Sequence, residues 1–185
     1  SFPSVTGIVL FSIFYMIIIY FVNLLVQNNY LHSDLGRFAC AIGRAGLTTN
    51  KIEGDHKTPV GEFKFKKIYY RKDKLGEMIF RIPFAIIREN DGWCDDPKSK
   101  LYNQHIQFPF DASAEKLFRD DDLYDLLVVI NHNTDPIVPG KGSAIFLHIN
   151  KPNFEGTEGC IAIEKENIIE LAKEIDLTTK LIIKD

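Results

Sequence analysis

Residues 143–163 read SAIFLHINKPNFEGTEGCIAI, in which an apolar segment is followed by a polar turn and a second apolar segment. The first segment, residues 143–149, is rich in aromatic and β-branched side chains, as is typical of a buried strand. His148 lies at its end, and Cys160 lies at the end of the turn. Gly156 and Gly159 allow backbone conformations there that other residues resist. Because the loop between them can fold back, we expect His148 and Cys160 to meet.

Cys160 and His148 together indicate a thiol nucleophile with an imidazole base. A thiol reacts as its thiolate, and a neighbouring imidazole is a common means of forming one near neutral pH. Gly159 permits a sharp turn before Cys160, which can aim consecutive amide N–H groups at one point as an oxyanion hole. The structural alternative is a small buried cysteine beside Ile161 and a hydrogen-bonded histidine at a strand end. The residues alone leave both interpretations open.

Outward from this stretch, the local patterns are mostly those of strands. Residues 163–175 alone place apolar side chains at helical spacing, and a last strand is expected at 180–184. Residues 72–122, interrupted by three prolines, are expected to be loop-rich. The other expected strands are about residues 23–27, 37–43, 61–70, 123–131 and 143–149. We therefore predict a mainly β fold, a sandwich or partly open barrel, with one helix in the C-terminal half.

The composition is that of an ordinary globular protein. The chain has 185 residues, 45% of them hydrophobic, with 22 Lys and Arg against 25 Asp and Glu. This length favours one domain, and this apolar content excludes disorder as the main state. The net charge of −3 lacks the basic footprint of a nucleic-acid-binding protein, so no nucleic-acid partner is expected. Three cysteines are too few for a disulfide scaffold.

The N-terminal region is strongly apolar. The first charged residue of the chain is Asp34, and residues 5–26 contain few polar side chains. A run of about 20 apolar residues has the length of a membrane-spanning helix. We expect a membrane anchor or signal segment over residues 1–22, followed by a strand. A buried strand is the alternative, since β-branched and aromatic residues dominate the run.

Three motifs resemble one known family. His148 with GTEGCI at 156–161 resembles the His…(Ser/Thr)-x-Gly-Cys signature of the L,D-transpeptidase catalytic domain, also called the YkuD domain. TPVGEF at 58–63 is similar to the Thr-Pro-x-Gly-x-Phe segment near the start of that domain. GWCDDP at 92–97 looks like the central loop of a bacterial subgroup. The resemblance covers roughly residues 23–176, and it implies a catalytic domain over residues 23–185 with the β fold of that family.

The resemblance implies a two-step acyl transfer on peptidoglycan stem peptides. Cys160 would be the nucleophile that expels a terminal D-Ala and forms a thioester, and His148 would be its base. An amine acceptor would then discharge the thioester and cross-link the cell wall. No metal or organic cofactor is implied. The expected oxyanion and substrate-binding residues are Gly159, Thr157, Trp93, Asp96 and Arg44.

Two departures from the family pattern limit this comparison. Many members carry Arg two residues after the cysteine, where this chain has Ala162. A cation there would have to come from elsewhere, and the candidates are Arg44, Arg81 and Lys151. Many members also have Gly directly after the histidine, so Ile149 should leave less room beside the imidazole.

Other functions remain open. Discharge of the same thioester onto water would make the protein an L,D-carboxypeptidase that trims stem tetrapeptides, and a non-catalytic wall-binding module is a further alternative. A zinc site is disfavoured because the possible ligands, His132, His148, Cys94 and Cys160, lack the short spacings of zinc motifs. We expect a monomer in the periplasm or otherwise outside the cytoplasm, held at the inner membrane if residues 1–22 are an anchor.

Overall fold

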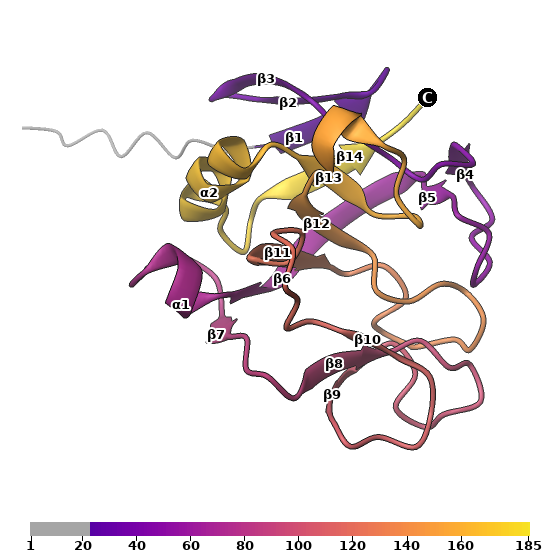
Figure 1. The fold of residues 1–185 in the computed structure, drawn as a ribbon. Helices are drawn as coiled ribbons and strands as arrows, with labels where there is room; N and C mark the ends of the chain where they lie inside the picture. The colour runs from indigo at the N-terminus through magenta and orange to yellow at the C-terminus, as the bar shows by residue number, and fades with distance from the viewer. Residues whose placement is uncertain (1–22) are drawn as a thin grey trace, which may run out of the picture.

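The computed structural model describes residues 23–185, which form a mainly β domain (Figure 1). The predicted fold class is confirmed, while the predicted anchor or signal at residues 1–22 lies outside the described residues. One large nine-stranded sheet organises the domain. Its strands are, in spatial order, β13 (Ile161–Ile163), β12 (Phe146–Ile149), β11 (Leu126–Ile130), β6 (Gly61–Tyr70), β14 (Lys180–Ile183), β1 (Asn23–Gln27), β2 (Tyr30–Ser33) and β3 (Gly36–Ala39), with β7 (Phe84–Ile86) beside β6.

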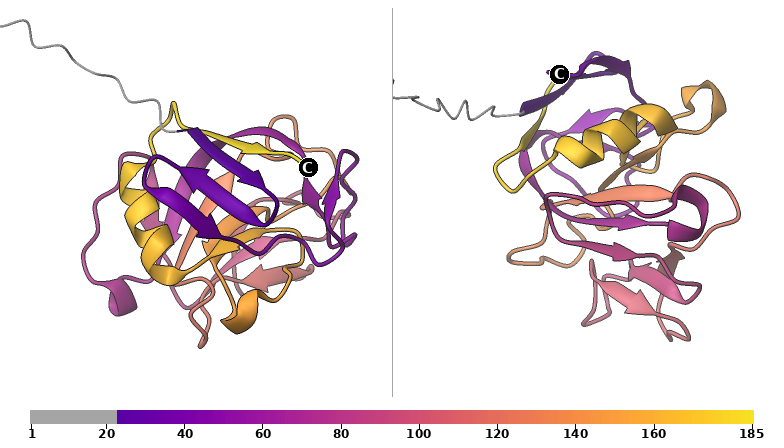
Figure 2. Two further views of the ribbon diagram at one scale, coloured as in Figure 1. Left: turned by 90° about the horizontal axis from the view of Figure 1, so that it is seen from above. Right: turned by 90° about the vertical axis from the view of Figure 1, so that its left-hand side faces the viewer.

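The two ends of this sheet approach each other and nearly close a barrel (Figure 2). Just beyond β3, Ala41 pairs antiparallel with Ala162 of β13. Two backbone hydrogen bonds of 2.8 and 2.9 Å join these residues. Next to them, Gly43 pairs with Thr157. The chain that follows β3 therefore lies against the turn that contains Cys160.

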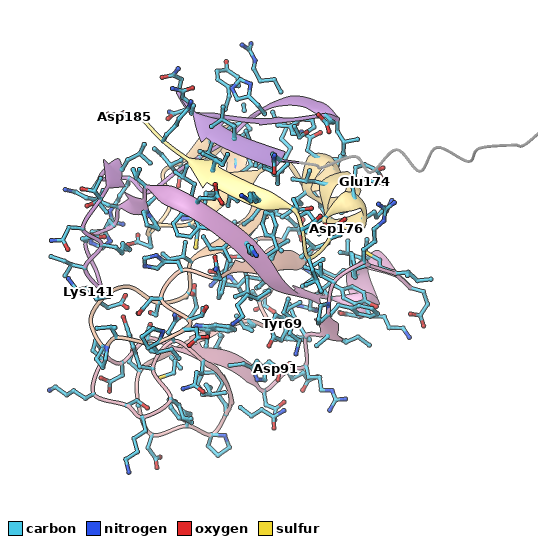
Figure 3. The ribbon with its side chains drawn as sticks, turned by 180° about the vertical axis from the view of Figure 1, so that it is seen from behind. Tyr69, Asp91, Lys141, Glu174, Asp176 and Asp185 are labelled. Atoms are coloured by element: carbon cyan, nitrogen blue, oxygen red, sulfur yellow. The ribbon has the colours of Figure 1, made fainter. Side chains whose placement is uncertain are left out.

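A smaller sheet packs below the main one in Figure 1. Its three strands are β8 (Asp91–Cys94), β9 (His105–Gln107) and β10 (Ala114–Lys116), and a further pair joins β4 (Leu47–Thr48) to β5 (Thr58–Pro59). Tyr69 of β6 stacks on His105, with 5.4 Å between ring centroids, and lies near Asp91 (Figure 3). Residues 72–122 are loop-rich as predicted, but they also contain these short strands, which the sequence did not indicate because strands of three or four residues show too little alternation to be recognised.

Helices occupy little of the described chain. The short elements are α1 (Lys72–Leu75) and the 3₁₀ turn η1 (Pro152–Phe154), and α2 (Lys165–Glu174) covers one face of the main sheet (Figure 2). Burial of Ile168, Leu171 and Ala172 fixes α2 there and confirms the helix predicted within residues 163–175. Among residues 23–185, no helix has the length and apolar character needed to cross a membrane.

Strand β11 separates two apolar cores. Alternate side chains of a strand point to opposite faces, and both faces of β11 are buried. Val128 belongs to the core that contains α2, whereas Leu127 and Val129 belong to the core under the small sheet. The neighbouring β12 continues this division, and its small-sheet face carries the residues of chemical interest.

Candidate active site

The strand pattern places His148 and Cys160 on one face of the main sheet. In β12, Leu147 packs into the α2 core and Phe146 into the opposite core, so His148 shares the face of Phe146. β13 runs parallel to β12 with Ala162 opposite His148. Cys160 directly precedes β13 and belongs to the same core as Phe146. The register of these neighbouring parallel strands thus brings the two residues to the same face of the sheet.

Both residues line one cavity of about 270 Å³. Its walls come from the segments before β11, before and within β12, and before and within β13. Thr157 and Ala162 contribute on the side of β13, and the small-sheet side contributes residues that no motif had indicated. Lining residues that matter below are His148, Thr157, Cys160, Ala162, Glu115 and Tyr124.

The Cys160 thiol is protonated in this environment. Its S–H donates to the carbonyl oxygen of Ala144 at 3.0 Å, and its sulfur accepts the amide of Phe146 at 3.3 Å. Burial, and after it the nearby carboxylate of Glu115, raises the pKa of the Cys160 thiol to about 12. Cys160 therefore needs a base to become a nucleophile near neutral pH.

His148 is neutral and oriented by the backbone. Burial is the main cause that lowers the pKa of His148, to about 4. The Nδ1 atom lies 2.7 Å from the carbonyl oxygen of Ile149, which can only accept a hydrogen bond, so Nδ1 carries the proton and Nε2 keeps its lone pair. The ring of Tyr124 meets the imidazole edge-on, with centroids 5.3 Å apart. The imidazole is therefore in the form that can take a proton.

A group of hydrogen bonds fixes the turn before Cys160. The Thr157 hydroxyl accepts the Gly159 amide at 3.1 Å and donates to the Cys160 carbonyl at 2.7 Å. The buried Thr58 hydroxyl donates to the Gly159 carbonyl at 2.9 Å. Gly159 has φ +135°, and a Cβ atom there would lie 3.0 Å from the carbonyl oxygen of Lys57. Within residues 23–185 the amide of Cys160 donates no hydrogen bond, whereas that of Gly159 is bound to Thr157.

Comparison with known families agrees with this geometry. The family model of the L,D-transpeptidase catalytic domain matches residues 22–183. The chain belongs to this family. No curated protein matches the sequence. Membership implies a peptidoglycan substrate and confirms the resemblance found in the three motifs.

Not all candidate residues of this L,D-transpeptidase domain line the cavity. Trp93 is buried and does not line it; its ring packs edge-on against Phe146, with centroids 5.1 Å apart, and its N–H donates to Asn103 at 3.0 Å. Asp96 accepts the amide of Lys98 in a turn outside the cavity lining. Arg44 forms an ion pair with Glu158 near the cavity, and its amide donates to Thr157. The structure therefore brings together Cys160, His148, Thr157 and Gly159, but not Trp93 or Asp96.

The cations proposed to compensate for Ala162 lie in different places. Arg81 pairs with Glu174 of α2 at 3.1 Å and does not line the cavity. Arg44 pairs with Glu158. Lys151 does line the cavity, and its ammonium lies 3.8 Å from the carboxylate of Glu155. Of the three candidates, only Lys151 lines the cavity, and its ion pair is the longest of the three.

Sequence reasoning missed a buried lysine behind the cysteine turn. Lys51 forms an ion pair with Asp55 and donates to the carbonyl of Ile52 at 3.2 Å. A Cβ atom on Gly159 would lie 3.4 Å from the Lys51 nitrogen. The charge of Lys51 lowers the pKa of Cys160, against the larger effect of burial. No motif marks this lysine, because its burial results from loops meeting in the folded domain.

A second pair was also missed. The Tyr124 hydroxyl donates to Glu115 at 2.7 Å inside the cavity lining. Burial raises the pKa of Glu115, and burial together with this carboxylate raises that of Tyr124. No motif marked either residue, since Glu115 lies in the stretch expected to be loop-rich and Tyr124 lies in the strand expected at residues 123–131.

Within residues 23–185, neither the two remaining cysteines nor the possible metal ligands form a second candidate site. Cys40 and Cys94 are buried and free, and burial raises the pKa of Cys40 to about 12. Cys40 belongs to the α2 core. In the part of the chain that the structure describes, no three His, Cys, Asp or Glu side chains are grouped as metal ligands would be.

Proposed function

We propose that this chain is a cysteine-dependent L,D-transpeptidase that cross-links peptidoglycan stem peptides through a thioester on Cys160. The observation that carries the proposal is the pairing, in one cavity, of a protonated thiol with a neutral imidazole whose Nδ1 proton is held by Ile149. A neutral acid and a neutral base that line one cavity suit proton transfer during nucleophilic attack. Family membership supports the reaction class.

In the first step, the thiol of Cys160 rotates away from Ala144 and gives its proton to Nε2 of His148. The sulfur attacks the carbonyl carbon that follows the L-centre of the diamino acid in a stem tetrapeptide. The C–S bond forms and the amide C–N bond breaks, and the imidazolium returns the proton to the departing amine of D-Ala. The amide of Cys160, which donates no hydrogen bond within residues 23–185, supplies a donor for the oxyanion of the intermediate.

In the second step, an acceptor amine attacks the thioester. Its proton passes to His148 as the new C–N bond forms, the C–S bond breaks, and the imidazolium returns the proton to the sulfur. Water can replace the amine, in which case the product is a trimmed tripeptide. The observation that favours this carboxypeptidase alternative is Ala162, which leaves the position opposite His148 small and uncharged.

Purified muropeptides with mass spectrometry of the products test the proposal. We expect a dimer joined between two diamino acid residues, together with free D-Ala, and no product from Cys160→Ala. Tripeptide without dimer, even with excess acceptor, would replace the transpeptidase by the carboxypeptidase. Unchanged muropeptides would overturn both and favour a wall-binding module.

A location outside the cytoplasm forms part of the same proposal. The peptidoglycan substrate that the family implies supports it, as does the uncharged run that precedes Asp34. Fractionation of cells that express the full chain, followed by protease accessibility in spheroplasts, tests it. Protection of residues 23–185 from external protease would contradict it.

A further inference from the structure

The carboxylates that line the catalytic cavity are not equally compensated. Three of the four glutamates there have a cation or two hydroxyl donors. Glu158 pairs with Arg44 and His56, Glu155 lies 3.8 Å from the Lys151 ammonium, and Glu53 accepts hydrogen bonds from Tyr102 and Ser143. The fourth, Glu115, accepts a single hydrogen bond, from the neutral hydroxyl of Tyr124, and forms no ion pair with any residue of 23–185.

Against the larger effect of burial, the charge of Arg119 acts on Glu115 and lowers the pKa of its carboxyl, but the two side chains form no ion pair. Arg119 also lines the cavity, but its Nε and Nη2 atoms donate to both oxygens of Asp121, at 2.8 and 2.6 Å. Keeping a carboxylate ionised away from water and without a paired cation costs free energy, and a bound ammonium group removes this cost. Burial raises the pKa of Glu115, which is the sign of that cost.

We infer that Glu115, held in place by Tyr124, binds a primary ammonium group of the peptide donor and so determines which donors Cys160 accepts. This inference rests on the proposed function, because a diamino acid next to the attacked carbonyl has such an ammonium on its side chain. The acceptor is the weaker choice of ligand, since its amine must lose a proton before it attacks. A charge-assisted hydrogen bond in this cavity would also set the orientation of the donor.

Occupancy of Glu115 also affects the nucleophile. The negative charge of Glu115 opposes formation of the thiolate at Cys160. A bound ammonium cancels that charge, so the thiol becomes easier to deprotonate when the right donor is present. By reciprocity, a thiolate at Cys160 strengthens ammonium binding at Glu115.

The first test uses two donors and two enzymes. The donors are a stem tetrapeptide with a free side-chain amine and the same peptide with that amine acetylated, and release of D-Ala gives KM and kcat. For the wild-type protein we expect kcat/KM to fall about tenfold or more on acetylation, as for loss of a buried charge pair. Glu115→Gln should lose most of this preference. Glu170→Gln, an exposed change on α2, should keep it. An undiminished preference in Glu115→Gln would overturn the inference.

The second test does not depend on turnover of a stem peptide. Alkylation of Cys160 by iodoacetamide is followed in ethylammonium chloride and in sodium chloride at equal ionic strength. We expect ethylammonium to accelerate alkylation of the wild-type protein about threefold, as a half-unit fall in thiol pKa would, and to leave Glu115→Gln unaffected. Without ammonium, Glu115→Gln should react faster than wild type, whereas a merely misfolded site would not behave in this way.

The outcomes separate the two proposals. If the wild-type protein releases D-Ala from neither donor but shows the ethylammonium effect, the proposed function fails and the ammonium site stands. If it releases D-Ala equally from both donors, the proposed function stands and the ammonium site is refuted. If Glu115→Gln does not fold, the comparison of the two donors on the wild-type protein still decides.

Discussion

The hydroxyl of Thr58 donates a 2.9 Å hydrogen bond to the carbonyl of Gly159, although 101 residues separate them in the chain. The same hydroxyl accepts the amide of Gly43 at 2.8 Å. Thr58 therefore joins the segment after β3 to the turn that presents Cys160. This contact gives a physical reason for the presence of the TPVGEF motif in a catalytic domain whose reactive residues lie far away in sequence.

Thr58→Val should weaken this turn. Valine has nearly the same shape but neither donates nor accepts, so a buried amide and a buried carbonyl lose their partner. We expect the free energy of unfolding to fall by about 1–3 kcal/mol, measured by urea denaturation. Acylation of Cys160 should also slow. Thr58→Ser keeps the hydroxyl and should remain closer to wild type, and a Val variant as stable as wild type would contradict this role.

Cys160 should be the one thiol that a carbapenem acylates. The intact protein should gain one drug mass, and Cys160→Ala should gain none. Cys40 and Cys94 are both buried and lie outside the catalytic cavity, which is the reason to expect no reaction there. An adduct on Cys160→Ala would show that another residue is the nucleophile.

His148→Ala should slow that acylation about 10²-fold or more at neutral pH, since a general base is lost. The low pKa of His148, about 4, means that the wild-type imidazole stays unprotonated at neutral and mildly acidic pH. We therefore expect the acylation rate to lose the contribution of the base only as the pH approaches 4. A wild-type rate in the variant would mean that some other group activates the thiol.

The pH dependence of the free energy of unfolding should also reveal the buried, neutral imidazole of His148. The ordinary pKa of this group is 6.5, and burial lowers it to about 4 in the folded state. Below pH 6.5 the unfolded chain therefore binds the proton first, so this group makes the free energy of unfolding fall as the pH drops from 6.5 to 4. His148→Gln should show a shallower fall over that range. Equal slopes for the two proteins would contradict the neutral burial of His148.

Asn103 should stabilise the segment at Ala144, whose carbonyl accepts the Cys160 thiol. Its Oδ1 accepts the Trp93 N–H at 3.0 Å and the amide of Ala144 at 3.1 Å, and the Ala144 carbonyl in turn accepts the Cys160 thiol. Asn103→Ala should cost about 2 kcal/mol or more in urea unfolding, because two buried donors lose their acceptor. Asn153→Ala is the matched control, since Asn153 is exposed and also has positive φ. Equal losses would assign the effect to backbone strain alone.

Removal of residues 1–22 should leave a folded, active domain. β1 begins at Asn23 and pairs with β14, and the family match begins at residue 22. The truncated chain should be soluble without detergent and should react with a carbapenem at the rate of the full chain. Unfolding of the truncated chain would show that the apolar run is part of the core.

The sequence predicted the parts of the fold whose patterns are long. β6 matches the prediction for residues 61–70, and α2 lies within the predicted residues 163–175. The strand predicted for residues 143–149 begins only at Phe146, because Ala144 adopts φ +51° and turns its carbonyl toward Cys160. No local pattern indicates such a conformation in an alanine, since it depends on contacts made after folding.

The sequence motifs predicted only the part of the candidate site that they themselves contain. Cys160 and His148 lie in adjacent segments of one sheet, so a single stretch of sequence indicated both. Lys51 lies behind the cysteine turn and Glu115 lines the cavity from the small sheet, and the burial of Lys51 and the Tyr124 contact of Glu115 are properties of the folded domain. The burial of Trp93 away from the cavity lining likewise depends on Phe146, which lies in another sheet.

The parallel pairing of β1 with β14 has a consequence for the biosynthesis of the domain. β14 lies between β6 and β1, so β1, the first strand of residues 23–185, cannot complete its place in the sheet until residues 180–183 have left the ribosome. Contacts of such long sequence separation form slowly. A growing chain therefore keeps its large sheet open throughout translation.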